Sequence, residues 1–275
     1  MKLRKAVKKA AKLKLGVSGT AGSGKTYGSL QLAHGLTGDW DKIALIDTEN
    51  RSGDLYADLG SYNVLTLQDF SPNSYIEAIQ ACEEAGMEVI IIDSITHEWQ
   101  WCLEYQTKLG GKYQDWGIVK PLHNKFKQAI LQSSCHIICT VRRKTEYGVE
   151  SGNEGKLKIT KLGTKEITEN EWEYELTVNF EVDQSHMAIA SKDRTRLFVD
   201  GEPRQLSSLD GEKLLKWSSE GSTEEALLQA ALIDISNCKS LDNLNKVYAA
   251  YDSLKGNSDF MNSLKETKKQ FINKV

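Results

Sequence analysis

The sequence predicts an α/β fold with a mostly parallel sheet, an antiparallel extension and a small helical appendage at the C-terminus. Over the first 140 residues, apolar β-branched runs without polar alternation are separated by stretches with helical periodicity, which is typical of parallel strands covered on both faces. After Arg142 the runs alternate between polar and apolar residues and are joined by short polar turns, as in antiparallel hairpins. From Thr223 onward the periodicity is helical.

These patterns place the elements along the chain. We expect buried strands at 13–18, 42–47, 88–93 and 136–141, and intervening helices at 25–36, 74–85 and 116–132. Antiparallel strands are expected at 156–161, 174–183, 187–191 and 196–199, and C-terminal helices at 224–238, 241–254 and 257–273. The expected division is a basic arm at 1–14, a core domain at 15–205, a linker at 206–222 and a helical segment at 223–275.

The composition is that of a globular protein. The chain has 275 residues, which is room for one large α/β domain and a smaller segment. With 40% hydrophobic and 27% charged residues, it lies outside the range of disordered chains. The longest purely apolar run, 89–92, is far too short to cross a bilayer, so we expect a soluble protein without a membrane partner.

The cysteine pattern favours a reducing compartment. The number of cysteines is odd, no two are spaced as CxxC, and they stand at Cys82, Cys102, Cys135, Cys139 and Cys238. Cys135 and Cys139 lie near His136 in one expected strand, but neighbouring strand residues point to opposite faces, which argues against a single tetrahedral metal centre. We therefore expect buried, reduced thiols and a cytoplasmic location.

The charge is concentrated at the N-terminus. Seven of the first 14 residues are lysine or arginine and none is acidic, while the whole chain carries a net charge of −3. No apolar segment follows that would make this start a cleavable targeting peptide. Two interpretations remain open: a solubilising, partly helical arm, or an arm that contacts phosphates.

A glycine-rich segment directly follows the first expected strand and leads into the helix expected at 25–36. It fits the pattern G-x-x-x-x-G-K-[ST], and its residues are Gly19, Thr20, Ala21, Gly22, Ser23, Gly24, Lys25 and Thr26. Glycines let the backbone curl so that successive N–H groups point at a phosphate beside a helix N-terminus. In this motif Lys25 reaches the β- and γ-phosphates of ATP and the Thr26 hydroxyl ligates Mg²⁺. A chance glycine-rich turn would not be expected to match so fully in this context.

Two acidic residues end neighbouring strands of the expected sheet. Asp93 follows four apolar residues, which suits a second, acidic anchor for Mg²⁺ in the manner of a Walker B strand. Glu49 closes the strand expected at 42–47, and the ends of parallel strands open onto one edge of a sheet. Glu49 can therefore face the γ-phosphate as the base that polarises water; the alternative is a solvated loop acid.

The order of these motifs resembles the RecA-like ATPase core. Residues 46–49 (Ile-Asp-Thr-Glu) and 55–60 (Leu-Tyr-Ala-Asp-Leu-Gly) resemble the segment that bears the catalytic glutamate of that family, which implies this role for Glu49. Within the group, residues 13–200 are most similar to phage-encoded RecA-like ATPases, including the Sak-type single-strand annealing and recombination proteins. Further similarity lies at 115–116, 140–147 and 191–195. A phage origin would place the protein in the cytoplasm of a bacterial host.

The resemblance also gives a role to two late cations. RecA-like rings and filaments such as the DnaB helicases and KaiC carry a K-x-R pair that reaches the ATP of the neighbouring subunit. Lys192 and Arg194 match this pair, and at a spacing of two they share one strand face. The resemblance implies that they neutralise charge on the γ-phosphate of an adjacent subunit in a ring or filament; the alternative is a solvated strand face.

One feature of the family is missing. RecA has a glutamine that senses the γ-phosphate at the end of the strand corresponding to 136–141, and this chain has none there. Thr140 or Arg142 could substitute for it.

Two segments at the expected ATP-bearing edge suit nucleic acid. Residues 97–116 are rich in aromatic residues and lysines, which can stack on unpaired bases and follow phosphates. Residues 142–165 hold seven bases against three acids, with glycines in the middle. The alternatives are ordinary helix packing for the first segment and a solvated hairpin for the second.

The sequence therefore predicts a Mg²⁺-dependent ATPase that oligomerises and binds single-stranded DNA in recombination or strand annealing, with a phage or host replication or recombination protein as a further partner. Two alternatives remain: an ATP-switched module that acts on a protein partner, and a helicase-loader or motor ATPase.

Overall fold

The computed structural model describes residues 11–151, 157–170, 172–219 and 224–272. Residues 1–10, which make up most of the expected basic arm, lie outside the described residues. The chain divides into a unit spanning Lys12–Trp217 and a second unit that contains Ser218–Val275. No helix among the described residues is long and apolar enough to span a membrane.

The centre of the first unit is a parallel sheet. Its strands are β1 (Lys14–Gly19), β2 (Ile43–Asp47), β3 (Asn63–Thr66), β4 (Val89–Asp93), the first part of β5 (His136–Ser151) and β7 (Val178–Val182). The order is β3-β2-β4-β5-β1-β7-β8, and β8 (Ala188–Asp193) adds antiparallel to β7. Strand β5 therefore separates β1 from β4, and the expected fold class, a RecA-like α/β core with an antiparallel extension and a helical appendage, is confirmed.

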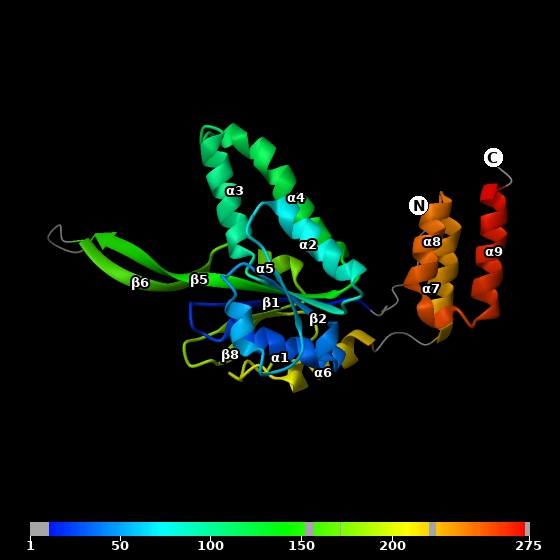
Figure 1. Cartoon of the computed structure of the whole chain (residues 1–275), viewed down its shortest axis with the longest axis horizontal. Helices are drawn as coiled ribbons and strands as arrows, with labels where there is room; N and C mark the ends of the chain where they lie inside the picture. The colour runs from blue at the N-terminus through cyan, green and yellow to red at the C-terminus, as the bar shows by residue number, and fades with distance from the viewer. Residues whose placement is uncertain (1–10, 152–156, 171, 220–223, 273–275) are drawn as a thin grey trace. The chain divides into compact units, whose positions relative to one another are not determined.

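Helices cover both faces of this sheet (Figure 1). One face carries α1 (Lys25–Thr37) and α6 (Ser208–Ser219), and the other carries α2 (Pro72–Glu84) and α4 (Trp116–Gln132). Consecutive strand residues alternate between the two cores: Leu45 belongs to the first and Ile46 to the second, and both are fully buried. This two-sided burial explains the uninterrupted apolar runs of the sequence.

The linker expected at 206–222 is wrong for most of its length. Helix α6 begins at Ser208, and its Leu214 is fully buried in the core beneath α1. Gly211 and Gly35 let the two helices approach closely, because a Cβ at Gly211 would collide with the α1 backbone. The first unit therefore extends to Trp217 and not to residue 205.

Other expectations also need correction. The start of the strand expected at 174–183 belongs to helix α5 (Trp172–Glu175). Residues 97–108, for which helix packing is the alternative given above, form most of helix α3 (Thr96–Lys108). Residues 196–199 are not a strand, because the Asp193 carboxylate accepts hydrogen bonds from the backbone N–H groups of Thr195 and Phe198 and holds a turn there. Short 3₁₀ turns occupy Trp40–Lys42, Ser52–Tyr56, Tyr113–Asp115 and Asp252–Leu254.

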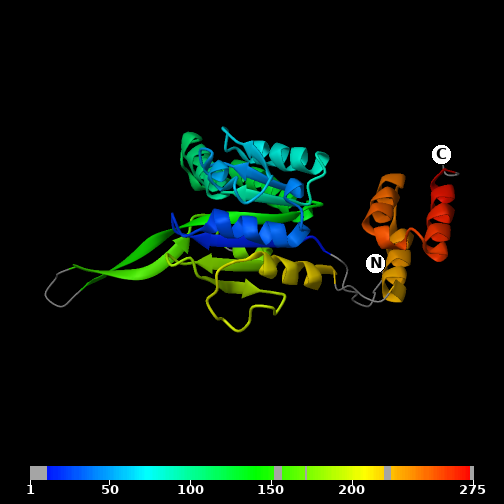
Figure 2. The same ribbon diagram turned by 60° about the horizontal axis from the view of Figure 1, so that its bottom comes forward.

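Strand β5 is much longer than expected. From Arg143 onward it pairs with β6 (Leu157–Glu166) in an antiparallel ribbon that extends beyond the central sheet (Figure 2). Arg143 fixes the root of this ribbon: its guanidinium donates to the Thr164 carbonyl over 2.7 Å and lies 3.1 Å from a carboxylate oxygen of Glu181. The glycines and lysine expected at the tip, within 152–156, lie outside the described residues.

The second unit has its own hydrophobic core. Helices α7 (Glu224–Asn237), α8 (Leu241–Ala250) and α9 (Ser258–Ile272) pack around buried residues that include Leu244, Leu254 and Phe260. The Ser240 hydroxyl accepts a hydrogen bond from the Asn243 N–H over 3.2 Å, so it caps the start of α8.

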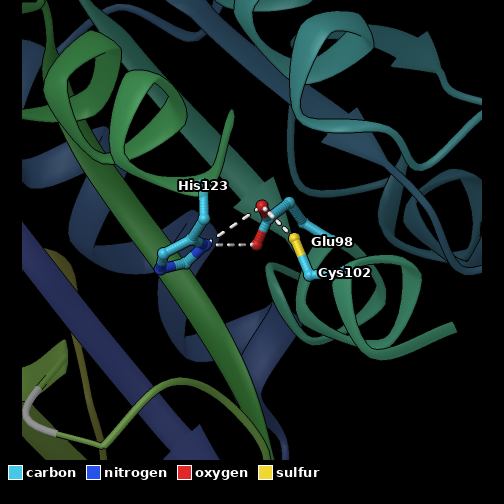
Figure 3. A group of neighbouring side chains, drawn as sticks. All are labelled: Glu98, Cys102 and His123. Atoms are coloured by element: carbon cyan, nitrogen blue, oxygen red, sulfur yellow. Dashed lines mark hydrogen bonds and ion pairs between the residues drawn. The ribbon is translucent and has the colours of Figure 1, made fainter. Parts of the chain in front are cut away.

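A buried polar cluster joins α3 to α4 (Figure 3). The Glu98 carboxylate accepts hydrogen bonds from the Cys102 thiol, one turn further along α3, and from Nδ1 of His123 on α4, at 3.2 and 3.0 Å. The other ring nitrogen of His123 lies 3.2 Å from the Glu169 carboxylate, which also binds Lys127. These residue types can ligate a metal, but here each ligand atom already has a protein partner, and the cluster acts as a hydrogen-bonded clamp.

The beginning of β1 is held by two buried groups. The Leu13 N–H donates to Nδ1 of His136 over 3.1 Å, which fixes a neutral imidazole there, and burial lowers the pKa of His136 to about 3. The Lys14 ammonium is buried and donates to the carbonyls of Ser133 and Cys135. Lys14 is therefore part of the core and not of an exposed basic arm.

Replacing His123 by alanine is expected to lower the free energy of unfolding of the first unit by about 3–5 kcal/mol, because the buried Glu98 carboxylate would keep only the Cys102 thiol as a donor. The matched control is Lys120→Ala, which removes an exposed ion pair to Glu169 at 3.8 Å and is expected to cost under about 1 kcal/mol. Urea unfolding followed by tryptophan fluorescence reports this unit alone, since all six tryptophans lie before Ser218. An equal loss in the free energy of unfolding for His123→Ala and Lys120→Ala would contradict a stabilising role of the Glu98–His123 hydrogen bond.

Acid is expected to destabilise the first unit through His136. Its pKa falls from about 6.5 in the unfolded chain to about 3 in the folded chain. The unfolded state therefore binds an extra proton below pH 6.5, and stability is lost as the pH falls, by about 2 kcal/mol at pH 5. The variant His136→Asn keeps an acceptor for Leu13 but cannot titrate. Urea unfolding at pH 7.5 and 5 should show a smaller loss for this variant than for the natural protein, and an identical loss would refute the assignment.

Candidate nucleotide-binding site

The glycine-rich segment forms a tight turn between β1 and α1. Gly22 and Gly24 have φ angles of +76° and +89°, a region that side chains disfavour. Gly24 caps the start of α1 without a side-chain hydrogen bond, so the first N–H groups of the helix face the turn. The Ser23 hydroxyl is buried and has no hydrogen-bond partner among the described residues. This arrangement of unused donors at a helix N-terminus suits a phosphate.

Lys25 lies inside this turn. Its side-chain nitrogen donates to the Thr20 carbonyl over 2.9 Å, and the residue is largely buried. Burial lowers the pKa of Lys25, while the nearby carboxylates of Asp93 and Glu49 act in the opposite direction. A cation held in place over a carbonyl is well placed to move to an incoming phosphate.

Asp93 joins three elements at the end of β4. One of its carboxylate oxygens accepts a hydrogen bond from the Thr26 hydroxyl over 2.6 Å, and the other accepts one from Thr140, in the first part of β5, over 2.5 Å. Burial raises the pKa of Asp93, and the two hydroxyls partly offset this effect. Hydroxyl and carboxylate oxygens are ligands that suit Mg²⁺, so Thr26 and Asp93 fit the metal that the motif implies.

Glu49 faces the same edge of the sheet. Its carboxylate binds Nε of Arg142 over 2.7 Å, and its backbone N–H donates to Asp47 over 2.6 Å. Burial alone would raise the pKa of Glu49, but the hydrogen bond and charge of Arg142, with smaller effects of His97 and Lys25, hold this pKa below its usual value. Glu49 is therefore an ionised carboxylate at neutral pH.

Thr48 and His97 complete this edge. The sequence places Thr48 in the segment 46–49 and His97 at the start of the segment 97–116, but it predicts no contact between them. The Thr48 hydroxyl accepts from the Ser94 N–H over 2.8 Å and lies 2.7 Å from Nδ1 of His97. The His97 ring stacks on Phe70 with centroids 4.9 Å apart. These contacts tie the end of β2 to the start of α3, beside Glu49.

A pocket of about 290 Å³ lies next to the glycine-rich turn. Its lining includes the rings of Tyr27 and Tyr56, the side chain of Leu206, and His186 in the turn between β7 and β8. Nδ1 of His186 lies 3.0 Å from the Ser23 carbonyl, so the turn between β7 and β8 contacts the glycine-rich turn. The aromatic and apolar lining suits a nucleobase. Of these four residues, the sequence motifs include only Tyr56, which lies in the segment 55–60.

The structure does not bring Lys192 and Arg194 to this site. Strand β8 runs antiparallel, so its Ala188 pairs with Val182 beside the turn, while Asp193 pairs with Val178 at the opposite end of the sheet. Lys192 and Arg194 donate there to the carbonyls of Glu173 and Tyr174, each over 2.5 Å. The expected phosphate-binding residues, the expected metal ligands and Glu49 lie together at the glycine-rich turn. Lys192 and Arg194 lie at the opposite end of the sheet.

A second concave surface lies on α3 and α4. Trp99 stacks on Trp116 with ring centroids 5.7 Å apart, and these rings line a groove of about 800 Å³ together with Tyr113 and Lys120. The Tyr113 side chain is 92% exposed. Part of the aromatic segment expected to meet nucleic acid is therefore on the surface, while Trp99 and Trp116 also pack against each other.

Comparisons with known proteins bear on the family. No curated protein matches this sequence at a significant level. Among solved structures, the chain is similar to a KaiC-like protein of the hyperthermophilic archaeon Pyrococcus horikoshii, with 16% sequence identity over 70% of this chain and 81% of that chain, and a TM-score of 0.40. Residues 11–202, more than half of the chain, match the profile of the AAA domain. The chain therefore belongs to the AAA domain family, and its first unit is a P-loop ATPase domain.

Proposed function

We propose that this protein is a Mg²⁺-dependent ATPase that assembles with copies of itself and binds single-stranded DNA, in phage-type recombination or strand annealing. The observation that carries the ATPase part is the convergence of the glycine-rich turn, Thr26, Asp93 and Glu49 at one edge of the sheet. A phosphate cradle, two metal ligands and an ionised carboxylate are the groups that ATP hydrolysis requires.

Each residue has a separate task in this proposal. The backbone N–H groups at the start of α1 and the ammonium of Lys25 bind the phosphates. Thr26 and Asp93 would hold Mg²⁺, which neutralises charge on the phosphates when bound. The Glu49 carboxylate orients the attacking water and accepts its proton. The pocket beside Tyr27 and Tyr56 takes the base of the nucleotide.

Assembly is supported by the position of Lys192 and Arg194. Because they lie at the end of β8 opposite to the glycine-rich turn, they cannot serve the ATP of their own subunit. At a subunit interface, the same position would present both cations to the nucleotide of a neighbour, where they would stabilise charge on the γ-phosphate. A ring and a filament both satisfy this geometry.

Binding of single-stranded DNA is supported by two features of the first unit. The sequence of the β5–β6 ribbon and its root, 142–165, has an excess of four positive charges, which suits a phosphate backbone. The groove on α3 and α4 offers the exposed Tyr113 ring and the Trp116 ring for stacking with bases.

The second unit supports an alternative. Residues 224–272 form a helical bundle with its own core, and such a bundle can bind another protein while ATP controls assembly. In that case hydrolysis would be slow and indifferent to DNA. A helicase-loader or motor role would instead require strand unwinding.

Steady-state ATP hydrolysis is expected to rise when single-stranded DNA is added and to rise per subunit with protein concentration, because the site is shared between subunits.

Lys25→Ala should abolish nucleotide binding, while Glu49→Gln should bind ATP and lose turnover by about 100-fold or more, as expected for removal of a general base. A rate per subunit that changes with neither single-stranded DNA nor protein concentration would favour the alternative in which the ATPase acts on a protein partner.

Two inactive variants are expected to restore activity when mixed. Arg194→Ala lacks the cation and Glu49→Gln lacks the base, but an interface between them can combine an intact Glu49 with an intact Arg194. Mixing equal amounts of assembled variants should recover up to about a quarter of the natural rate, if subunits exchange at random and neighbouring sites act independently. Absence of recovery, with mixed assembly verified by size, would count against a shared site.

A further inference from the structure

The second unit has a groove of about 260 Å³ that is lined by residues of α8 and α9 (Figure 1). Leu244 and Leu264 line it and belong to the core of the unit, with 3% and 8% of their surface exposed. Met261 is partly buried beside them, and the Tyr248 side chain is 40% exposed. The unbranched Met261 side chain can adapt to what it contacts. The groove therefore offers an apolar surface on which another large apolar side chain can be buried.

Three lysine side chains lie around this apolar surface. Lys265 and Lys268 line the groove from α9 and are exposed, and neither makes an ion pair or hydrogen bond with the residues that the structure describes. The Lys255 ammonium lies 4.8 Å from the centre of the Tyr248 ring and pairs with Asp252. No described acidic residue lines the groove. The apolar surface is therefore bordered by positive charge.

This positive charge is local to the groove. Residues 224–272 hold seven acidic and six basic residues, so the unit as a whole is close to neutral. Nucleic acids gain most of their affinity from many cations that neutralise successive phosphates. A few lysines around an apolar groove instead match a protein segment that carries acidic side chains next to an apolar one.

We propose that the groove between α8 and α9 binds an acidic segment of a partner protein. One large apolar side chain of that segment is buried against Met261 and Tyr248, and its carboxylates bind the ammonium groups of Lys265, Lys268 and Lys255. The pair of Lys255 with Asp252 is exposed and is easily exchanged for a partner's carboxylate. This contact goes beyond the proposed ATPase activity, because none of its groups belongs to the nucleotide site.

The first test is the binding of a defined peptide to the full-length protein, measured by fluorescence polarisation. The probe is a short fluorescein-labelled peptide of aspartate and glutamate with one central phenylalanine. It should bind with a Kd of about 100 µM or tighter. Changing its phenylalanine to serine, or its acids to asparagine and glutamine, should each weaken binding by about tenfold. Absence of binding, or equal binding of the three peptides, would overturn the proposal.

The second test reverses the charge of the groove. The double variant Lys265→Glu, Lys268→Glu should bind the acidic peptide at least about tenfold more weakly and should bind a peptide in which lysines replace the acids. This gain requires a folded groove, so it separates lost recognition from lost structure. The matched control Lys246→Gln changes an exposed lysine of α8 that does not line the groove and should leave the affinity unchanged. An unchanged affinity in the double variant would refute the assignment.

Two further measurements exclude other occupants of the groove. An oligothymidine that binds more tightly than the acidic peptide, and loses this binding in the double variant, would make nucleic acid the ligand and the proposal wrong. A double variant that assembles differently in light scattering but keeps its peptide affinity would assign the groove to contact between copies, which also overturns the proposal. All peptide affinities are measured without nucleotide, so they stand even if the protein proves not to hydrolyse ATP.

Discussion

The buried carboxylate of Asp93 is the constraint on which the site depends. A carboxylate in the interior is costly unless hydrogen bonds satisfy its oxygens. Asp93 obtains them from Thr26 at the start of α1 and from Thr140 on β5, while its backbone carbonyl accepts from the Thr48 N–H over 2.8 Å. The side chain and the backbone carbonyl of this one residue at the end of β4 thereby fix the start of α1 and two neighbouring strands, which sets the geometry of the site.

The direction of the strands decides which residues can cooperate within one subunit. Strands β1, β2, β4 and β5 run parallel, so their ends place the glycine-rich turn, Glu49, Asp93 and Arg142 at a common edge. Strand β8 runs the other way and carries Lys192 and Arg194 to the opposite edge. Within one subunit, the topology therefore keeps these two cations apart from the groups at the glycine-rich turn.

The sequence predicted the parts of the fold and the site that follow from local pattern. The strand ends at Asp47 and Asp93 and the bounds of α4 agree with the structure, because strands buried on both faces and an amphipathic helix have distinct periodicities. The sequence pattern predicts a linker where α6 forms, because the burial of this helix comes from its contact with α1, which the local pattern does not contain. His186 could not be found either, because it reaches Ser23 through a tertiary contact spanning 163 positions.

The least predictable feature is the pair of arginines at the end of the sheet. Adjacent residues on a strand point to opposite sides, so Arg142 binds Glu49 in the site while Arg143 binds Thr164 and Glu181 at the root of the β5–β6 ribbon. The sequence shows two neighbouring bases and no reason to separate them. In the fold, the strand segment that binds Glu49 at the candidate site is also the segment that anchors the ribbon.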